Sequence, residues 1–380
     1  MRIAVIGGGP GGLYFAYLWK RRHPDARLDL FEQNAAGATW GFGVVFSEQA
    51  LEFLRADDPD TVDVIAPRME SWKNITLNLR GESVEIDGVG FSSIGRLELL
   101  TILQDRVRSV GVAPRYDTLI ASVDQLTGYD LIVGADGLNS LVRRAFEGDF
   151  GTSLSYSANK FAWYGTTKRF ETLSQTFVET ELGSFNAHHY RYSPGMSTFL
   201  VECDLATWQR YGFADKTVEE SKSICERVFA ATLDNSLVSN RSVWRNFPWI
   251  WNERWSFRNM VLIGDALHSA HFSIGSGTRL AIEDAIALTK ALEAERDIPA
   301  GLDRYQTGRK PIVKKLVTAA RTSADWYEKF PEHMKLGLMD FAYGYIIRSG
   351  RIDNARLRAM SPAFMAKYEA SRQALRQRGG

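Results

Sequence analysis

The first 32 residues alternate between short apolar runs and one segment with helical periodicity. Residues 2–6 form an apolar run that leads into glycines, which predicts a buried strand of a parallel sheet. Residues 11–23 repeat apolar side chains at helical spacing, and residues 27–32 predict a second strand. Together they predict a strand–helix–strand unit at the N-terminus.

Later segments extend this unit into a larger α/β sheet. Residues 96–110 carry leucine and valine on one face, which predicts an amphipathic helix. Residues 129–134 predict another buried strand, and residues 260–263 predict a strand that returns to the same sheet. From residue 282 onward the pattern is mostly helical.

The period changes in the middle of the chain. Residues 160–202 are rich in β-branched and aromatic side chains with glycine and proline at turns, which predicts an inserted antiparallel sheet. Residues 217–233 predict a helix, and residues 37–47 predict a loop rich in glycine and phenylalanine. The four tryptophans within residues 244–255 favour interior packing over a recognition surface.

Composition and charge narrow the class of protein. A net charge of +1 gives no general attraction to nucleic acid or to anionic membranes. Two cysteines in 380 residues favour a reducing compartment. The N-terminal apolar run is too short for a signal peptide, and no run reaches the ~18 residues of a membrane span. We therefore expect a cytoplasmic protein with neither a nucleic-acid nor a membrane partner.

The charge is unevenly distributed. Residues 345–380 contain seven arginines and one lysine against one aspartate and one glutamate. Such a segment is either a solvated helical tail or a landing surface for an acidic part of a substrate.

The glycines after the first strand fit a dinucleotide-binding fingerprint. Gly7, Gly9 and Gly12 would allow a tight turn, let a pyrophosphate approach the backbone, and let helix pack on strand, with Gly11 beside them. Glu32 closes the second strand, where its carboxylate would accept hydrogen bonds from a ribose. This fingerprint alone does not separate FAD from NAD.

Two further acidic residues follow strands far along the chain. Asp136 lies in a glycine-flanked turn before a predicted helix, and Asp265 follows Gly264 at the end of residues 260–263. Gly275 and Gly277 open the next helix, a suitable end for a negatively charged or dipolar ligand. This arrangement favours a flavin held from both ends of the sequence. The alternative is a pair of ordinary aspartates that cap helices.

The elements and motifs predict an α/β fold. It comprises a Rossmann-like FAD-binding domain with an inserted antiparallel β-sheet substrate domain and a helical C-terminus. We assign residues 1–155 to the first part of the FAD-binding domain and 156–255 to the substrate domain. Residues 256–295 return to the FAD-binding domain, and residues 296–380 form the helical C-terminal region.

The chain resembles the single-component flavoprotein aromatic hydroxylases, the para-hydroxybenzoate hydroxylase-like family. Three motifs carry the resemblance: Gly7-x-Gly9-x-x-Gly12, Gly134-Ala135-Asp136-Gly137 with Ser140 and Arg143, and Gly264-Asp265-Ala266-x-His268. It extends from Met1 to about Leu292.

The resemblance implies roles for individual residues. Glu32 would bind the adenosine ribose, Arg96 would contact the flavin phosphate or ribityl region, and Asp265 would hold the ribityl chain. Asp136 would lie near the pyrophosphate and the NAD(P)H route. The backbone around Gly275, Gly277 and Thr278 would face the flavin ring. The chain departs from the family there, because Ser273 and Arg279 stand where proline and asparagine are usual.

The resemblance also implies the reaction. NADH or NADPH would visit transiently and reduce bound FAD. The reduced flavin and O2 would form a C4a-hydroperoxide, whose distal oxygen attacks an electron-rich aromatic ring. No metal is needed, and the histidines lack the spacing of metal ligands.

A narrower resemblance points to aryl-CoA hydroxylases that act on salicylyl-CoA or 2-aminobenzoyl-CoA, and to the tryptophan-derived hydroxylase of violacein biosynthesis. The matching segments are Gly41-x-Gly43-Val44-Val45-Phe46-Ser47, Asn159-Lys160-Phe161-x-Trp163-Tyr164-Gly165-Thr166, Ala187-His188-x-Tyr190 and His271-Phe272-Ser273-Ile274-Gly275. An aryl-CoA such as salicylyl-CoA is the expected substrate. A free aromatic or indole-derived metabolite is the alternative, and a non-oxygenating flavin-binding protein is the alternative of another class.

Three residues are candidates for the catalytic site. His188 and Tyr190 are two residues apart on a predicted strand and so share one face, which would lie over the flavin. His188 is the first candidate to hydrogen-bond a phenol or amine of the substrate. His271 flanks the expected flavin loop. For each histidine, a packed or solvated side chain is an equally good reading.

Overall fold

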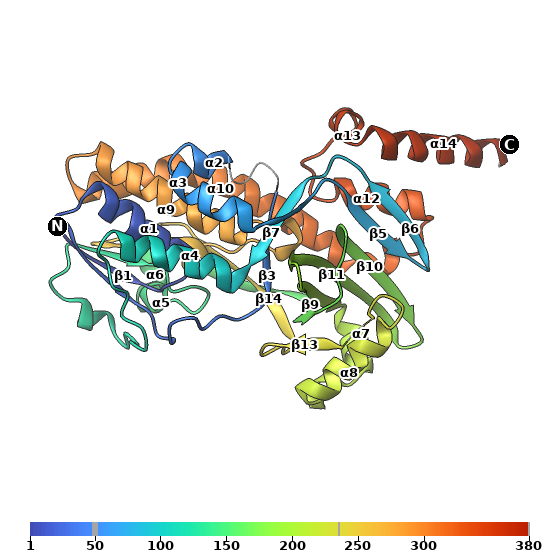
Figure 1. Ribbon diagram of the computed structural model, residues 1–380, viewed down its shortest axis with the longest axis horizontal. Helices are drawn as coiled ribbons and strands as arrows, with labels where there is room; N and C mark the ends of the chain where they lie inside the picture. The colour runs from blue at the N-terminus through green and yellow to red at the C-terminus, as the bar shows by residue number, and fades with distance from the viewer. Residues whose placement is uncertain (48–51, 235, 379–380) are drawn as a thin grey trace.

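The chain folds into a nucleotide-binding half and a half built on a large, mainly antiparallel sheet (Figure 1). Among the described strands of that sheet, only β5 (Ile75–Leu79) and β10 (Leu173–Thr180) pair in parallel. The computed structural model describes residues 1–47, 52–234 and 236–378. The N-terminus lies at the outer end of the first half, and the last helix extends from the second half, so the ends of the chain lie far apart.

A five-stranded sheet forms the centre of the nucleotide-binding half. Its order is β15-β16-β8-β1-β2, and only β15 is antiparallel to its neighbour. The strands are β1 (Arg2–Ile6), β2 (Arg27–Phe31), β8 (Leu131–Gly134), β15 (Ser256–Phe257) and β16 (Met260–Leu262). The strands predicted near residues 2, 27, 129 and 260 are therefore confirmed.

Long helices cover this sheet (Figure 1). They are α1 (Pro10–Arg22), α4 (Arg96–Ser109), α9 (Gly277–Ala294) and α10 (Ile298–Glu328). α1 packs on α4 and α9, and α9 packs on α10. Because α1 comes from the start of the chain and α9 from its last third, their packing joins sequence motifs that are more than 250 residues apart.

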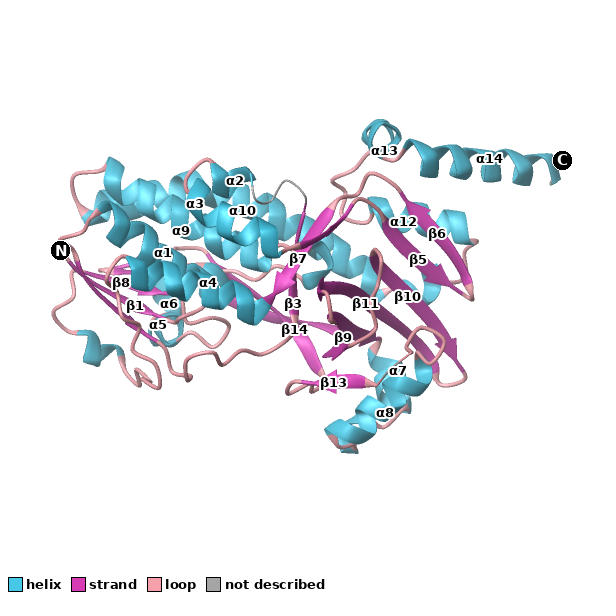
Figure 2. Cartoon of the chain, viewed as in Figure 1, coloured by secondary structure: helices cyan, strands magenta, loops and turns pink. Residues whose placement is uncertain are grey.

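The large sheet has the order β13-β9-β12-β11-β10-β5-β6, with β14 also paired to β9 (Figure 2). Its strands are β5 (Ile75–Leu79), β6 (Glu82–Ile86), β9 (Thr152–Thr166), β10 (Leu173–Thr180), β11 (Gly183–Ser193), β12 (Met196–Cys203), β13 (Leu237–Ser239) and β14 (Arg245–Asn252). The antiparallel sheet predicted from residues 160–202 is confirmed. It also includes β5 and β6, which lie within the range assigned to the first part of the FAD-binding domain. The four domain ranges remain a prediction.

A small sheet joins the two halves. It consists of β3 (Gly43–Ser47), β7 (Phe91–Gly95) and β4 (Glu70–Trp72), with β7 in the middle. The prediction of a loop over residues 37–47 was wrong for residues 43–47. The run Gly-Val-Val-Phe-Ser pairs with a strand almost fifty residues away, and this distant pairing outweighs the local glycine and phenylalanine pattern.

The C-terminal region is helical, as predicted. After α10 come α11 (Phe330–His333), α12 (Leu338–Ile347), α13 (Asn354–Met360) and α14 (Pro362–Arg378). The shorter helices elsewhere are α2 (Glu52–Arg55), α3 (Pro59–Ile65), α5 (Leu141–Ala145), α6 (Glu147–Phe150), α7 (Leu205–Arg210) and α8 (Val218–Val228). α8 is thus shorter than the helix predicted over 217–233. Across the described residues, no helix is both long and apolar enough to cross a bilayer.

Candidate functional site

The glycine-rich turn between β1 and α1 has the geometry of a pyrophosphate site. Gly7 has a φ of 107°, and a Cβ at Gly12 would overlap the carbonyl oxygen of Gly7. Gly9 differs, because a Cβ there would meet no atom within 4 Å. Gly9 lines a cavity and caps α1 without a side-chain hydrogen bond, so no protein side chain caps this helix N-terminus beside the cavity.

Glu32 and Asp136 both line this cavity. Glu32 accepts a hydrogen bond of 2.7 Å from the Gly8 N–H and is held at its other oxygen by Asn34. Asp136 uses Oδ2 to accept from the Leu141 N–H at 2.6 Å, while its buried Oδ1 has no partner among the described atoms. Burial raises the pKa of Asp136. An orphaned acceptor beside open N–H groups is suited to a ligand that carries hydroxyls.

Direct contacts join the three sequence motifs. The Arg143 side chain is buried and donates to the carbonyl oxygen of Ala266 at 3.0 Å. Gly11 in α1 packs closely against Ala281 in α9, because a Cβ at Gly11 would lie 3.1 Å from the carbonyl oxygen of Ala281. The glycine fingerprint, the turn at Asp136 and the turn at Asp265 therefore form one continuous site.

Arg96 and Asp265 line a second, inner cavity. Burial lowers the pKa of Arg96, whereas attraction to the negative charge of Asp265 raises it. The Arg96 side chain is also fixed by Thr39, whose hydroxyl lies 3.1 Å from Nε. Asp265 is accessible because it lines this cavity.

The start of α9 forms another wall of the inner cavity, through residues that include Gly275, Gly277 and Thr278. Gly275 is left-handed with a φ of 59°, and a Cβ there would press against Val45 of β3. The helix has no side-chain cap at Ser276. No side chain therefore caps the start of α9, where Gly277 and Thr278 line the cavity.

The far wall of the inner cavity belongs to the large sheet. His188 and Tyr190 of β11 both line it, which agrees with their predicted common face. The Tyr190 hydroxyl donates to the carbonyl oxygen of Gly43 at 3.0 Å. The remaining wall is largely apolar and includes Phe91, Trp163, Leu173, Leu200, Phe247 and Phe272. Such a wall is suited to an aromatic ring and excludes water from it.

A buried polar network lies behind this wall. Nδ1 of His188 is 2.9 Å from Nε2 of Gln175, and Nε2 of His188 is 3.3 Å from the Glu202 carboxyl. Asn159 donates to the other oxygen of Glu202, and the Tyr327 hydroxyl donates to Gln175. Burial lowers the pKa of His188 to about 3 and raises the pKa of Glu202, so both groups favour their neutral forms.

This network changes the role available to His188. Both of its ring nitrogens have protein partners, so neither is free to hydrogen-bond a substrate in this arrangement. Gln175 also lines the cavity and was not identified from the sequence. The sequence did contain a signal for Glu202, namely a carboxyl within the apolar run of residues 199–203.

His271 lies behind the cavity rather than on its wall. It is 2% exposed and packs against Phe247, Trp249 and Phe272. Its Nδ1 accepts a hydrogen bond from the Ser273 N–H at 3.3 Å, and burial lowers its pKa to about 4. This position favours a role in shaping the loop over direct contact with a substrate.

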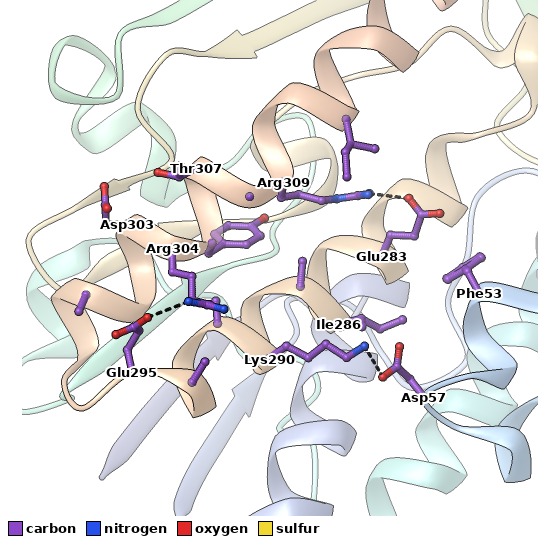
Figure 3. Close-up of a pocket in the computed structure, with 17 residues that line it drawn as sticks. Phe53, Asp57, Glu283, Ile286, Lys290, Glu295, Asp303, Arg304, Thr307 and Arg309 are labelled. Carbon is purple, nitrogen blue, oxygen red and sulfur yellow. Dashed lines mark hydrogen bonds and ion pairs between the residues drawn. The ribbon is translucent and has the colours of Figure 1, made fainter.

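Another cleft lies elsewhere, between α9, α10 and the α2–α3 region (Figure 3). It measures about 1000 Å3 and is crossed by ion pairs from Arg309 to Glu283 and from Lys290 to Asp57. None of the predicted cofactor or catalytic residues lines it. The two cavities lined by the predicted residues, and not this cleft, therefore form the candidate active site.

Together, the fold and the two cavities define a dinucleotide-binding α/β enzyme with a dry aromatic site beside its cofactor site. The orphaned Asp136 oxygen, the open Gly9 position and the uncapped starts of α1 and α9 fit FAD. Residues 100–320 match the family described as "FAD binding domain". That match covers more than half of the chain, so the chain belongs to this family.

Three characterised relatives agree with this assignment. Salicyloyl-CoA 5-hydroxylase from Streptomyces sp. is 38% identical, over 97% of this chain and 73% of that protein. 3-Hydroxy-4-methyl-anthranilyl-[aryl-carrier protein] 5-monooxygenase from Streptosporangium sibiricum is 36% identical, over 90% and 93%. Protodeoxyviolaceinate monooxygenase from Chromobacterium violaceum is 34% identical, over 92% and 94%.

A solved structure shows the same fold. The tetrameric form of 2-methyl-3-hydroxypyridine-5-carboxylic acid oxygenase superimposes with a TM-score of 0.72 at 18% identity, covering 94% of this chain and 95% of that one. The protein is thus an FAD-dependent aromatic monooxygenase. The resemblance to flavoprotein aromatic hydroxylases and the predicted fold class are confirmed.

Proposed function

We propose that this monooxygenase hydroxylates an aromatic ring carried as a thioester, with salicylyl-CoA as the first substrate to test. The observation that carries the proposal is the similarity, at 36–38% identity over at least 90% of the chain, to two enzymes whose names specify an aryl-CoA and an aryl-carrier protein. The overall reaction consumes one aromatic C–H, O2, NAD(P)H and a proton, and yields the phenol, water and NAD(P)+.

The size of the inner cavity supports this substrate class. About 240 Å3 is below the ~300–1,000 Å3 typical of pockets that enclose a drug-sized ligand. An aromatic ring fits within such a space, whereas a CoA or a carrier protein does not. The rest of a thioester would therefore extend out of this cavity, whose wall includes Arg348 from the basic C-terminal region.

The residues divide the work as follows. The backbone at Gly7, Gly9 and Gly12 would hold the pyrophosphate of FAD, Glu32 its adenosine ribose, and Asp265 with Arg96 its ribityl region. When bound, FAD supplies the redox and oxygen-activating chemistry. The apolar wall keeps water away from the reacting ring.

His188 acts in this proposal through Gln175. The imidazole fixes the Gln175 amide, which faces the cavity and is able to hydrogen-bond a hydroxyl or amino group of the ring. The neutral His188–Glu202 pair keeps net charge away from the ring. Tyr190 fixes the β3 backbone at Gly43 and closes the same side of the cavity.

Substrate-stimulated NADH and NADPH oxidation tests the proposal. Purified protein with FAD is assayed with salicylyl-CoA, 2-aminobenzoyl-CoA and the two free acids, while oxygen uptake and product mass are recorded. We expect the CoA esters to stimulate oxidation and to gain one oxygen atom. Stimulation by the free acids alone would refute the thioester proposal.

A second candidate is a free aromatic or indole-derived substrate. It is favoured by the 34% identity to protodeoxyviolaceinate monooxygenase. An indole carboxylic acid in the same assay distinguishes it, since coupled hydroxylation of that compound without activity on CoA esters would support this second candidate.

A further inference from the structure

Four arginines come from the start of α9, the end of α12, the turn after α12 and the first turn of α13, and one of them, Arg348, lines the inner cavity. We call them the arginine cluster: Arg279, Arg348, Arg351 and Arg356. Arg348 lines the cavity and donates to the carbonyl oxygen of Ser273 at 2.9 Å, which pins the end of α12 to the loop before α9.

The turn after α12 brings the cluster together. α12 ends at Ile347, Gly350 in the following turn adopts a left-handed φ of 68°, and α13 begins at Asn354. Nη1 of Arg356 lies 3.5 Å from the carbonyl oxygen of Arg351. Desolvation lowers the pKa of Arg351, and the positive charges of Arg279 and Arg356 lower it further.

Acidic partners are few at this position. Arg279 pairs with Glu283 at 2.7 Å, but Arg348, Arg351 and Arg356 form no ion pair with another described residue. Nε of Arg348 is buried and has no hydrogen-bond partner within the described part of the chain. Like charges that converge without carboxylates repel one another, and an anion with several oxygen acceptors relieves that repulsion.

The rest of the basic tail is different. Arg358 pairs with Glu369 at 2.9 Å, and Arg372 pairs with Asp340 at 3.4 Å. Both pairs lie on the exposed surface of the C-terminal helices. The sequence left two interpretations of the basic segment open. We assign the solvated helical tail to α14 and the surface for an acidic part of a substrate to the turn between α12 and α13.

We propose that the arginine cluster binds a phosphate group of the phosphopantetheine arm that carries the aromatic acyl group. This inference rests on the proposed thioester substrate. The ligand chemistry is common to two sources, because CoA and a carrier protein both present a phosphate at the end of the pantetheine chain. Arginine is suited to it, since its fork donates two parallel hydrogen bonds to phosphate oxygens.

The test compares three salicylyl thioesters: of pantetheine, which has no phosphate, of 4′-phosphopantetheine, and of CoA. The measured quantity is the ratio of KM for the pantetheine ester to KM for each phosphorylated ester. The intact enzyme is expected to prefer both phosphorylated esters. Arg351→Gln should lower that ratio about tenfold, the effect of one charge-assisted hydrogen bond, and Arg351→Lys should lower it less.

Arg358→Gln is the matched control. It also removes a cation from the basic C-terminal segment, but the guanidinium of Arg358 is already paired with Glu369. Its ratio should equal that of the intact enzyme. An unchanged ratio in Arg351→Gln would overturn the proposal. A drop for the CoA ester without a drop for the phosphopantetheine ester would also overturn it, and would assign the cluster to the nucleotide phosphates of free CoA.

A binding measurement separates this proposal from the proposed function. Titration calorimetry with CoA itself needs no turnover. If no thioester is hydroxylated, the proposed function fails, while CoA binding that Arg351→Gln weakens about tenfold would still support the phosphate site. If the thioesters are hydroxylated and the variant matches the intact enzyme in both assays, the function stands and the arginine cluster has no part in it.

Discussion

The buried carboxylate of Asp284 lies 2.8 Å from Nε2 of His268, which follows the short helical turn Gly264–Ala266 that presents Asp265. The same Asp284 oxygen accepts a hydrogen bond from the Gly264 N–H at 3.0 Å. Its other oxygen accepts from Nε of Arg309 at 2.9 Å. A fully buried carboxylate in α9 thus fixes both ends of the turn that is expected to hold the ribityl chain.

Replacing Asp284 should therefore affect both stability and FAD binding. Asp284→Asn removes the negative charge that faces Arg309 and His268, and breaking a buried ion pair of this kind destabilises by roughly 3–5 kcal/mol. We expect a lower midpoint of thermal unfolding and a higher Kd for FAD, measured by flavin fluorescence. Glu295→Gln disrupts the more exposed pair with Arg304 and should change stability by less than about 1 kcal/mol. Equal effects of the two substitutions would contradict the assigned role of Asp284.

The glycine turn offers a test that separates folding from cofactor binding. A Cβ at Gly9 meets no protein atom within 4 Å, so Gly9→Ala should fold normally, yet its methyl group would enter the expected pyrophosphate position. A Cβ at Gly12 overlaps the Gly7 carbonyl and should disrupt the packing of α1 on β1. We expect Gly9→Ala to keep its unfolding midpoint and lose FAD affinity, and Gly12→Ala to lose both. Normal FAD affinity in Gly9→Ala would place the pyrophosphate elsewhere.

The His188 network predicts uncoupled turnover. His188→Ala removes the group that fixes Gln175 and leaves Glu202 with one partner fewer, while FAD contacts are untouched. Hydroxylation per NAD(P)H oxidised should fall about tenfold or more, as for a lost positioning contact, and FAD should remain bound. Gln175→Ala should reproduce this loss. Product yield and NAD(P)H consumption are measured together, and normal coupling in His188→Ala would exclude it from the mechanism.

The elements that were predicted correctly share a local signal. β1, β2 and α1 are encoded by apolar runs and periodicity within about 30 residues, the length of one strand–helix–strand unit. β3 was missed because its partner β7 is far along the chain, so that a short segment starting with glycine becomes a strand only through that pairing. The same limit applies to β5, which joins the large sheet by pairing with β10.

The candidate cofactor residues could be proposed from the sequence because glycines and strand-end aspartates mark backbone geometry that sequence spacing reveals. The residues around the expected substrate position were harder to predict from the sequence. The neighbours of His188 come from three separate elements, through Gln175 in β10, Glu202 in β12 and Tyr327 in α10, and no spacing relates them. His271 was selected for its proximity in sequence to the flavin loop, but its backbone turns the ring away from the cavity wall and into an aromatic cluster.

Buried neutral histidines should make the fold sensitive to mild acid. Burial lowers the pKa values of His188 and His189 to about 3 and that of His271 to about 4, against about 6.5 in the unfolded chain. Between those values the unfolded chain binds more protons, so stability is complete above about pH 6.5 and is lost as the pH falls toward 4. Each histidine contributes up to about 1.4 kcal/mol per pH unit in that window.

His189 is the best position for testing this pH dependence, because it packs behind the large sheet on Phe170 and Phe199 and does not line the inner cavity. His189→Gln should flatten the dependence of unfolding free energy on pH between about 6.5 and 4.5, measured by urea denaturation, because one proton uptake is removed. Thr176→Val removes the hydrogen bond to His189 but keeps the imidazole, so it should lower stability at every pH and preserve the slope. Identical slopes in His189→Gln and the intact protein would show that His189 does not take up a proton on unfolding in this range.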